Sequence, residues 1–199
     1  AEVLHYPAEE GVAFWHFPSF LEWSGKRGIL RILSPESLAG KVADFDECRI
    51  SLIQRSAPTP PEGITTEIVY VGEGTEERHY RGAKGKIAIC DCHDLHKVFE
   101  PARKSGVCGL ILYRQKPLEG LRKGDGVEGV RQYNSFWWEE KGLFGFVLTP
   151  EDGRRLVEYL RSSQSRKHPV KAWALVNSER YPGTLEVVSS LIEGKEQRE

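Results

Sequence analysis

The sequence predicts an α/β fold that leans towards α+β: a β-rich domain with a mixed sheet, one βαβ crossover and a second packed helix. Two short apolar runs, 86–90 and 107–113, are bounded by glycine, which favours buried strands. A helical pattern separates them, and so short a crossover leaves its two strands parallel and adjacent with a right-handed connection. A third run, 143–148, leads directly into a second helical pattern.

The helix of the crossover has recognisable ends. Asp94 is a suitable N-cap, and Val98 and Ala102 fall at positions i and i+4 on one face. Gly106 can end the helix in the left-handed conformation. The run 68–71 and the glycine-rich turn after it complete the unit that organises the chain, residues 67–113.

These residues resemble the protease-associated (PA) domain. That family has a Val-Gly-x-Gly turn, a Gly-Lys-Ile strand and an Ala-x-x-x-Gly-Ala-x-Gly-x-Ile segment. Here they are matched by Val71-Gly72-x-Gly74, by Gly85-Lys86-Ile87 and by the segment 102–111, in which Val107 replaces the usual alanine. The resemblance implies a binding or regulatory module rather than a catalyst.

Composition limits the classes of partner. The 199 residues carry a formal net charge of −1, so the sequence shows no electrostatic footprint for nucleic acid or for an anionic membrane. No apolar run approaches the roughly 20 residues of a spanning helix, and we expect a soluble chain with no nucleic-acid or membrane partner. The sequence has no methionine, so we expect Ala1 to follow processing or a boundary. The compartment stays open.

Before the crossover, the first 23 residues are dense in aromatic side chains and broken by prolines. Their spacing fits neither a helix nor a strand cleanly. They either form an exposed surface for another domain or a peptide, or fill the near side of the core, and we favour the second interpretation. Runs at 28–33 and 50–53 predict strands, and Pro35 starts a short helix or turn. The proline-rich segment 57–63 predicts a stiff connector.

After the crossover, residues 120–142 predict surface loops that end in a second aromatic patch. Successive side chains of an extended segment point to opposite faces, so at least one of Trp137 and Trp138 is expected to be exposed. We therefore predict a binding surface in this loop. Its candidate residues are Tyr133, Phe136, Trp137 and Trp138.

The second helix has clear signals. Thr149 is a candidate N-cap with Pro150 at the first helical position and acidic residues following, and Leu156, Val157 and Leu160 share one face. The helix is expected to end near Ser162. Strands are then predicted at 170–177 and 185–192, joined by a turn at 181–184.

The end of the chain extends the family resemblance. PA domains of this kind are inserted in zinc-dependent aminopeptidases, where a Val-x-x-x-Ile-x-Gly strand leads into the catalytic domain; Val188, Ile192 and Gly194 match it. The two zinc ions of such enzymes need a His-x-Asp pair, an adjacent Glu-Glu pair and further ligands, and the full set is absent from this sequence. Glu139-Glu140 superficially resembles the Glu-Glu pair, but no His-x-Asp segment precedes it, and its aromatic setting suits a surface loop. The resemblance thus implies no catalytic residue and no cofactor in this chain, with zinc in the parent's catalytic domain.

Cysteine and histidine are concentrated in one segment, 90–96. Cys92, His93 and His96 are weak metal-ligand candidates, but the spacing does not fit a zinc knuckle, and we favour a structural role. Cys90 and Cys108 lie on strands predicted to be neighbours. A disulfide between them is conceivable, and two buried thiols are the commoner outcome.

Together these patterns predict three parts. Residues 1–63 form an aromatic-rich segment with strands that pack on or precede the module, residues 64–184 form the PA-like domain, and residues 185–199 lead towards a catalytic domain. We expect a non-catalytic module that acts as a lid, specificity wall or interaction surface towards a peptidase domain or a peptide. A free-standing interaction or oligomerisation domain is the alternative, and a homo-oligomer is compatible with either.

Overall fold

The computed structural model describes residues 1–120, 127–162, 164–192 and 194. It divides into two compact units, which are described separately below. The sheet unit comprises residues 24–179, and the ribbon unit comprises residues 1–23 with the described residues from 180 onwards.

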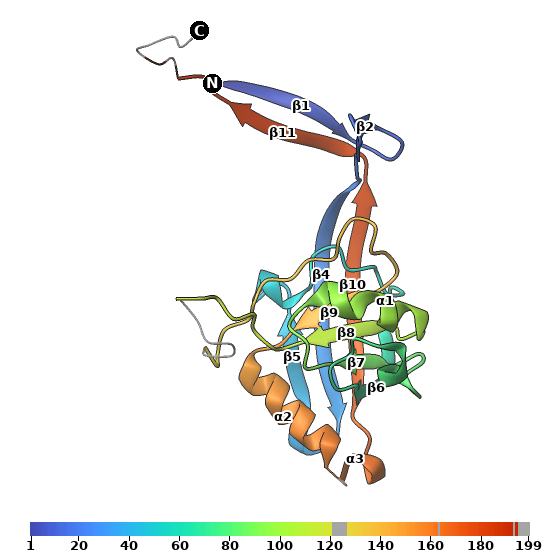
Figure 1. Cartoon of the computed structure of the whole chain (residues 1–199). Helices are drawn as coiled ribbons and strands as arrows, with labels where there is room; N and C mark the ends of the chain where they lie inside the picture. The colour runs from blue at the N-terminus through green and yellow to red at the C-terminus, as the bar shows by residue number, and fades with distance from the viewer. Residues whose placement is uncertain (121–126, 163, 193, 195–199) are drawn as a thin grey trace. The chain divides into compact units, whose positions relative to one another are not determined.

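The sheet unit is built on one mixed sheet of seven strands in the order β5-β4-β10-β6-β7-β8-β9 (Figure 1). Strands β6 to β9 are parallel to one another, while β10 is antiparallel to β6 and β5 is antiparallel to β4. The predicted fold class is confirmed. The strands are β4 (Glu22–Ser34), β5 (Gly40–Asp44), β6 (Ile64–Tyr70), β7 (Ile87–Ile89), β8 (Gly109–Leu112), β9 (Phe144–Val147) and β10 (Lys171–Tyr181).

The predicted crossover is confirmed as β7, α1 (Leu95–Lys104) and β8. Strands β7 and β8 pair in parallel, with Ile87 opposite Gly109. Every residue of both strands is buried, as expected for a parallel sheet covered on both faces. After α1, Gly106 adopts φ +72°, the left-handed conformation that ends the helix.

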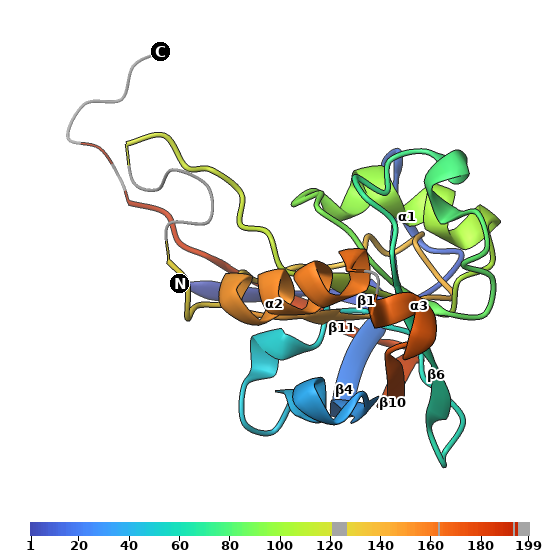
Figure 2. The same cartoon turned by 90° about the horizontal axis from the view of Figure 1, so that it is seen from below.

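The second predicted helix is α2 (Pro150–Arg161), with Thr149 as its N-cap. The Asp152 backbone N–H donates to the Thr149 hydroxyl at 3.1 Å. Gly153 lets this helix approach the sheet, because a Cβ at this position would lie 2.2 Å from the Cβ of Tyr113. A short helix α3 (Gln164–Lys167) follows, and α1 and α2 lie apart from one another in both views (Figures 1 and 2).

The strand predicted at 50–53 is wrong. Residues Arg49–Ser51 form a 3₁₀ turn, η2, closed by a hydrogen bond from the Ser51 N–H to the Cys48 carbonyl. Within the run 50–53, Leu52 makes an isolated bridge to Phe146 of β9. Burial explains the apolar run, because Leu52 and Ile53 are 3% and 0% exposed and pack close to Gly28 of β4 and Gly145 of β9. Two further 3₁₀ turns are η1 (Glu36–Leu38) and η3 (Glu77–Tyr80).

The ribbon unit pairs the two ends of the described chain. Strands β1 (Glu2–Ala8) and β11 (Gly183–Ser189) are antiparallel, with Leu4 opposite Val187. A small hairpin of β2 (Ala13–Phe14) and β3 (Phe17–Pro18) carries aromatic side chains. Trp15 is 95% exposed, so its ring does not fill a core, contrary to the interpretation that we favoured.

The strand predicted to run to Ile192 ends at Ser189. Part of the loop region predicted at 120–142 lies outside the described residues. In the described part of the chain, no helix combines the length and the apolar character needed to cross a membrane.

Candidate functional site

The first turn of α1 places one side of the candidate site. The chain leaves β7 at Ile89, passes through four residues and enters the helix at Asp94, its N-cap. The His96 N–H donates to the Asp94 carboxylate at 3.2 Å, which satisfies one of the helix's unpaired N–H groups. This cap fixes where the His96 side chain begins.

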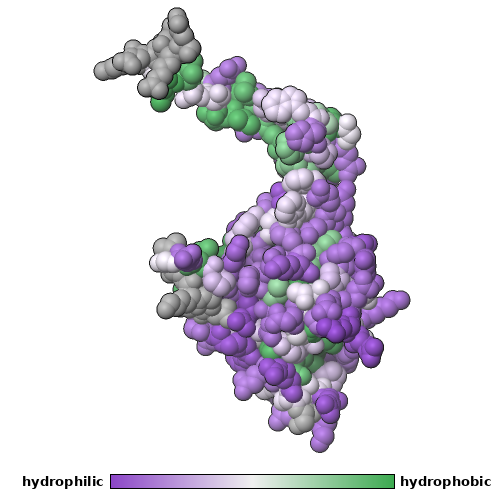
Figure 3. All heavy atoms as spheres, viewed as in Figure 1, coloured by the Kyte–Doolittle hydropathy of each residue, from purple (hydrophilic) through white to green (hydrophobic). Residues whose placement is uncertain are grey.

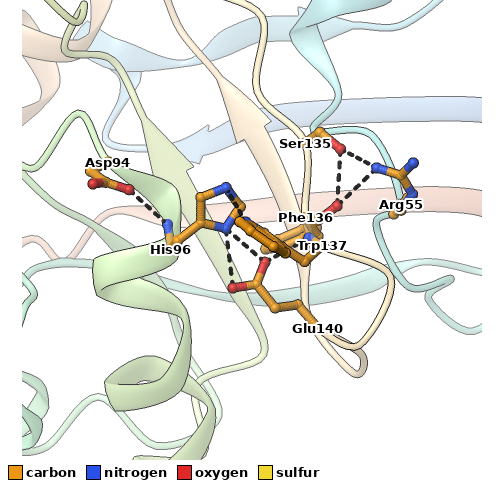
Figure 4. Close-up of polar contacts among 7 residues, drawn as sticks. All are labelled: Arg55, Asp94, His96, Ser135, Phe136, Trp137 and Glu140. Atoms are coloured by element: carbon orange, nitrogen blue, oxygen red, sulfur yellow. Dashed lines mark hydrogen bonds and ion pairs between the residues drawn. The ribbon is translucent and has the colours of Figure 1, made fainter. Parts of the chain in front are cut away.

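The aromatic loop forms the other side and is anchored to residues 54–55. Gln54 exchanges backbone hydrogen bonds with Asn134 and Phe136, each at 3.0 Å. The Arg55 guanidinium donates to the Ser135 hydroxyl at 2.5 Å and to the Phe136 carbonyl at 3.0 Å (Figure 4). A loop with these contacts has a defined register, so its side chains have defined directions.

That register corrects one of the predicted surface residues. Phe136 is 1% exposed, and its ring packs edge-on against Phe99 of α1 with centroids 5.6 Å apart. Because side chains alternate along the anchored segment, the inward direction of Phe136 leaves its neighbour Trp137 outside. Tyr133 and Trp137 are each about half exposed, at 56% and 49%, and Trp138 is partly buried.

His96 joins the helix to the loop. Its Nδ1 lies 3.1 Å from the nearer carboxylate oxygen of Glu140, and its Nε2 lies 2.5 Å from the indole nitrogen of Trp137 (Figure 4). The Trp137 backbone N–H also donates to Glu140, at 2.7 Å. An indole N–H can only donate, so His96 Nε2 accepts and the imidazole proton lies on Nδ1, where it donates to Glu140.

A hollow of about 350 Å³ lies between the helix start and the loop. It brings together residues from two separate predictions, since His93 and His96 line it with Tyr133. The other lining residues are Asp94, Leu95, Lys116, Gln132, Asn134 and Ser135. The hollow therefore offers imidazole, amide, hydroxyl and ammonium groups beside an aromatic ring, a set suited to binding a polar ligand or a peptide segment.

The cysteines near this site are buried thiols. Cys92 is buried and exchanges hydrogen bonds with the backbone of Asp94. Burial raises the pKa of both Cys92 and Cys90, so the thiol is favoured over the thiolate that binds metals. Among the residues that the structure describes, no three histidine, cysteine, aspartate or glutamate side chains converge where a metal ion could bind.

The structure pairs neither Cys90 nor Cys108 in a disulfide, and all four cysteines are free thiols. Burial raises the pKa of Cys108 to about 11. Sequence reasoning found the aromatic loop and the histidines separately, but it missed the roles of Glu140 and Arg55. Glu140 contacts both His96 and Trp137, and Arg55 donates hydrogen bonds to Ser135 and Phe136 of the loop. No local pattern identifies these roles, because His96 lies 44 positions from Glu140, and the partners of Arg55 lie 80 and 81 positions from it.

No family model matches the chain, and no curated protein matches it. Solved structures with a similar fold include BSAP, a zinc aminopeptidase from Bacillus subtilis, with a TM-score of 0.54, 18% identity and coverage of 82% of this chain and 35% of that chain. A peptidase M28 precursor from Shewanella amazonensis SB2B has a TM-score of 0.55, 15% identity and coverage of 93% and 40%. This chain thus spans well under half the length of the peptidase structures whose fold it shares.

Proposed function

We propose that this chain is a non-catalytic protease-associated module of a zinc aminopeptidase-like protein. The supporting observation is the fold. Most of this chain, 82% and 93%, aligns in structure with 35% and 40% of two peptidase chains. In this proposal residues 64–184 are the PA-like domain, residues 1–63 precede it, and residues 185–199 lead towards a catalytic domain that holds zinc.

The local chemistry of the crossover supports the assignment of the module. In the segments that resemble the PA family, the glycines lie where the backbone has positive φ angles, and the alanine lies where the helix is buried. Gly72, Gly74 and Gly85 all have positive φ angles, and Gly106 ends α1. Ala102 is fully buried on the face of α1 that packs on the sheet.

The working surface in this proposal is the loop surface, defined as Tyr133, Trp137 and Trp138 with the hollow beside them. Two half-exposed rings held by hydrogen bonds to His96, Glu140 and Gln54 are rigid anchors, which is the kind of side chain that dominates protein and peptide contacts. Phe136 holds the loop from beneath. The surface acts as a lid or specificity wall over a peptide, or as a contact for the catalytic domain.

The first experiment is to read the coding sequence beyond Glu199. The proposal expects a His-x-Asp segment and the remaining zinc ligands there, and a stop codon at that point overturns it. The complete protein then allows a functional comparison. Replacing Trp137 by alanine should raise KM for a peptide of several residues more than for a single-residue chromogenic substrate, because the larger substrate reaches the module.

Trp15→Ala is the matched control for Trp137→Ala, since it removes an exposed indole from the ribbon unit. Equal changes in KM for both substrates after Trp137→Ala, or the same change after Trp15→Ala, would contradict the role given to the loop surface. Melting temperatures of all variants show whether each one is folded.

A second candidate function is a free-standing interaction or oligomerisation domain. Two features of the ribbon unit favour it. Trp15 and Phe17 are exposed, and a hollow of about 560 Å³ is lined mainly by apolar side chains. The lining residues are Tyr6, Ala13, Phe14, Trp15, Leu185 and Val187. Sedimentation velocity over a range of concentrations tests it. Self-association that disappears in Trp15→Ala supports this function, and a monomer at all concentrations counts against oligomerisation.

A further inference from the structure

A further hollow of the sheet unit lies at the carboxyl ends of the parallel strands β7 and β8. It has a volume of about 520 Å³. Asp91 follows β7 by two residues, Tyr113 follows β8 directly, and most of the other lining residues come from α2. Ligands of open α/β sheets bind at this edge, where strands end and helices begin. The lining residues are Asp91, Tyr113, Arg114, Arg154, Val157, Glu158, Arg161 and Ser162.

The floor of this hollow is fixed by one carboxylate. Tyr70 is the last residue of β6, and Tyr113 directly follows β8. Both hydroxyls donate hydrogen bonds to the carboxylate of Asp91, which lies just after β7. Burial, together with this hydrogen bond, raises the pKa of Tyr70 to about 12, so its hydroxyl stays a neutral donor at physiological pH. Gly153 brings α2 against Tyr113 and so sets the position of the wall.

The wall carries two opposite charges one helical turn apart, Glu158 and Arg161. The guanidinium carbon of Arg161 lies 5.9 Å from the ring centre of Tyr70. In the part of the chain that the structure describes, Arg161 and Glu158 form no ion pair with each other or with another side chain. Arg154, in contrast, pairs with Glu128. Residues three apart on a helix lie on one face, so both charges are presented to the same hollow.

We propose that this hollow binds a free amino acid in its zwitterionic form. The ligand carboxylate accepts hydrogen bonds from Arg161, because a guanidinium presents paired donors that match the two carboxylate oxygens. The ligand ammonium donates to Glu158. Val157 and the ring of Tyr113 provide an apolar contact for an aliphatic side chain. The proposal rests on this hollow alone and holds whether or not the chain is part of a peptidase.

The test is an NMR titration of the ¹⁵N-labelled chain with L-leucine, N-acetyl-L-leucine and L-leucine amide. Leucine should cause saturable shifts of amide signals around 113–114 and 154–162, with a dissociation constant on the order of 1 mM, as is reasonable for a ligand of about nine heavy atoms. Each blocked ligand lacks one charge and should bind about tenfold more weakly. The three ligands test both charges with an unmodified protein.

Matched variants assign the two partners. Arg161→Gln and Glu158→Gln should each weaken leucine binding about tenfold, since each removes a hydrogen bond to a charged group. Arg155→Gln lies on the same helix but does not line the hollow, so it should leave affinity unchanged.

Several outcomes overturn the proposal. Absence of saturable shifts with leucine does so, as does equal binding of leucine and its amide. Equal binding of leucine and the N-acetyl form removes the role of Glu158 and leaves a simple carboxylate site. Equal weakening by Arg155→Gln and Arg161→Gln shows that only the general positive charge of α2 matters.

Discussion

The sheet unit and the ribbon unit use similar residues to opposite effect. In β7, β8 and β9 every residue is buried, whereas most residues of β11 are exposed. Figure 3 shows hydrophobic side chains gathered along the ribbon, while the visible face of the sheet unit is largely hydrophilic. The exposed apolar residues of the ribbon include Val3, Val187 and Val188.

The difference shows where the chain's stability lies. A seven-stranded sheet with helices packed on it buries its own apolar residues, whereas two strands alone are marginally stable in water. Exposed apolar surface of this kind commonly marks a contact with another protein or domain. We therefore expect changes in the core of the sheet unit to have large effects on stability and changes in the ribbon to have small ones.

The largest expected effect comes from Phe136→Ala. Removing a fully buried phenylalanine should lower the free energy of unfolding by about 3–5 kcal/mol, because the cavity adds to the lost burial. Urea denaturation measures this change. A loss below about 1 kcal/mol would mean that the aromatic loop is not part of the core.

Gly153→Ala is the next test, and it sets two effects against each other. Helix propensity favours alanine by about 1 kcal/mol, but its Cβ would lie 2.2 Å from Tyr113. We expect the overlap to dominate, with a net loss of about 1–3 kcal/mol. Gly129→Ala is the control, because nothing lies within 4 Å of a Cβ at that position. Stabilisation by Gly153→Ala would disprove the close approach of α2.

Alkaline pH tests the tie between Tyr70 and Asp91. The pKa of Tyr70 rises from its ordinary value of 10.0 to about 12 in the fold, so its contribution is complete below pH 10 and is lost as pH rises through 12. Tyr70→Phe should cost about 1 kcal/mol at neutral pH and should flatten the decline above pH 10. Denaturation curves at a series of pH values give both quantities. An unchanged decline in the variant would assign the alkaline loss to other groups.

The smallest expected effect lies in the ribbon. Val188→Ser should change the free energy of unfolding by no more than about 0.5 kcal/mol, because Val188 is 72% exposed. Backbone amides of β1 and β11 should also exchange with solvent at least about a hundredfold faster than those of β7 and β8. Equal protection of the two regions would show that the ribbon is stabilised as strongly as the sheet.

Much of the sheet unit could be predicted from local patterns. The crossover and α2 were predicted correctly because their caps, glycines and apolar periods are all encoded within a few residues. The run at 50–53 misled because apolar character reports burial and does not specify strand pairing. Strand β1 was not predicted, although every second residue, Leu4, Tyr6 and Ala8, is less exposed than its neighbours. Pro7 and the many aromatic residues around it obscured that alternation.

The candidate site was less predictable than the fold. His96 and Trp137 were recognised as candidate residues, but the hydrogen bond that joins them spans 41 positions of the sequence, so no local pattern predicts it. The hollow beside Asp91 was not predicted at all. Its lining residues come from the ends of β7 and β8 and from α2, which are far apart in the sequence and are brought together by the sheet topology.

The short connection between β7 and α1 has one more implication. Asp91 lines the hollow beside α2, and His93, two positions later, lines the hollow beside the aromatic loop. Both proposed binding sites therefore depend on the same few peptide units, which lie between a buried strand and a capped helix. A shift of this connection would therefore displace one lining residue of each hollow at the same time.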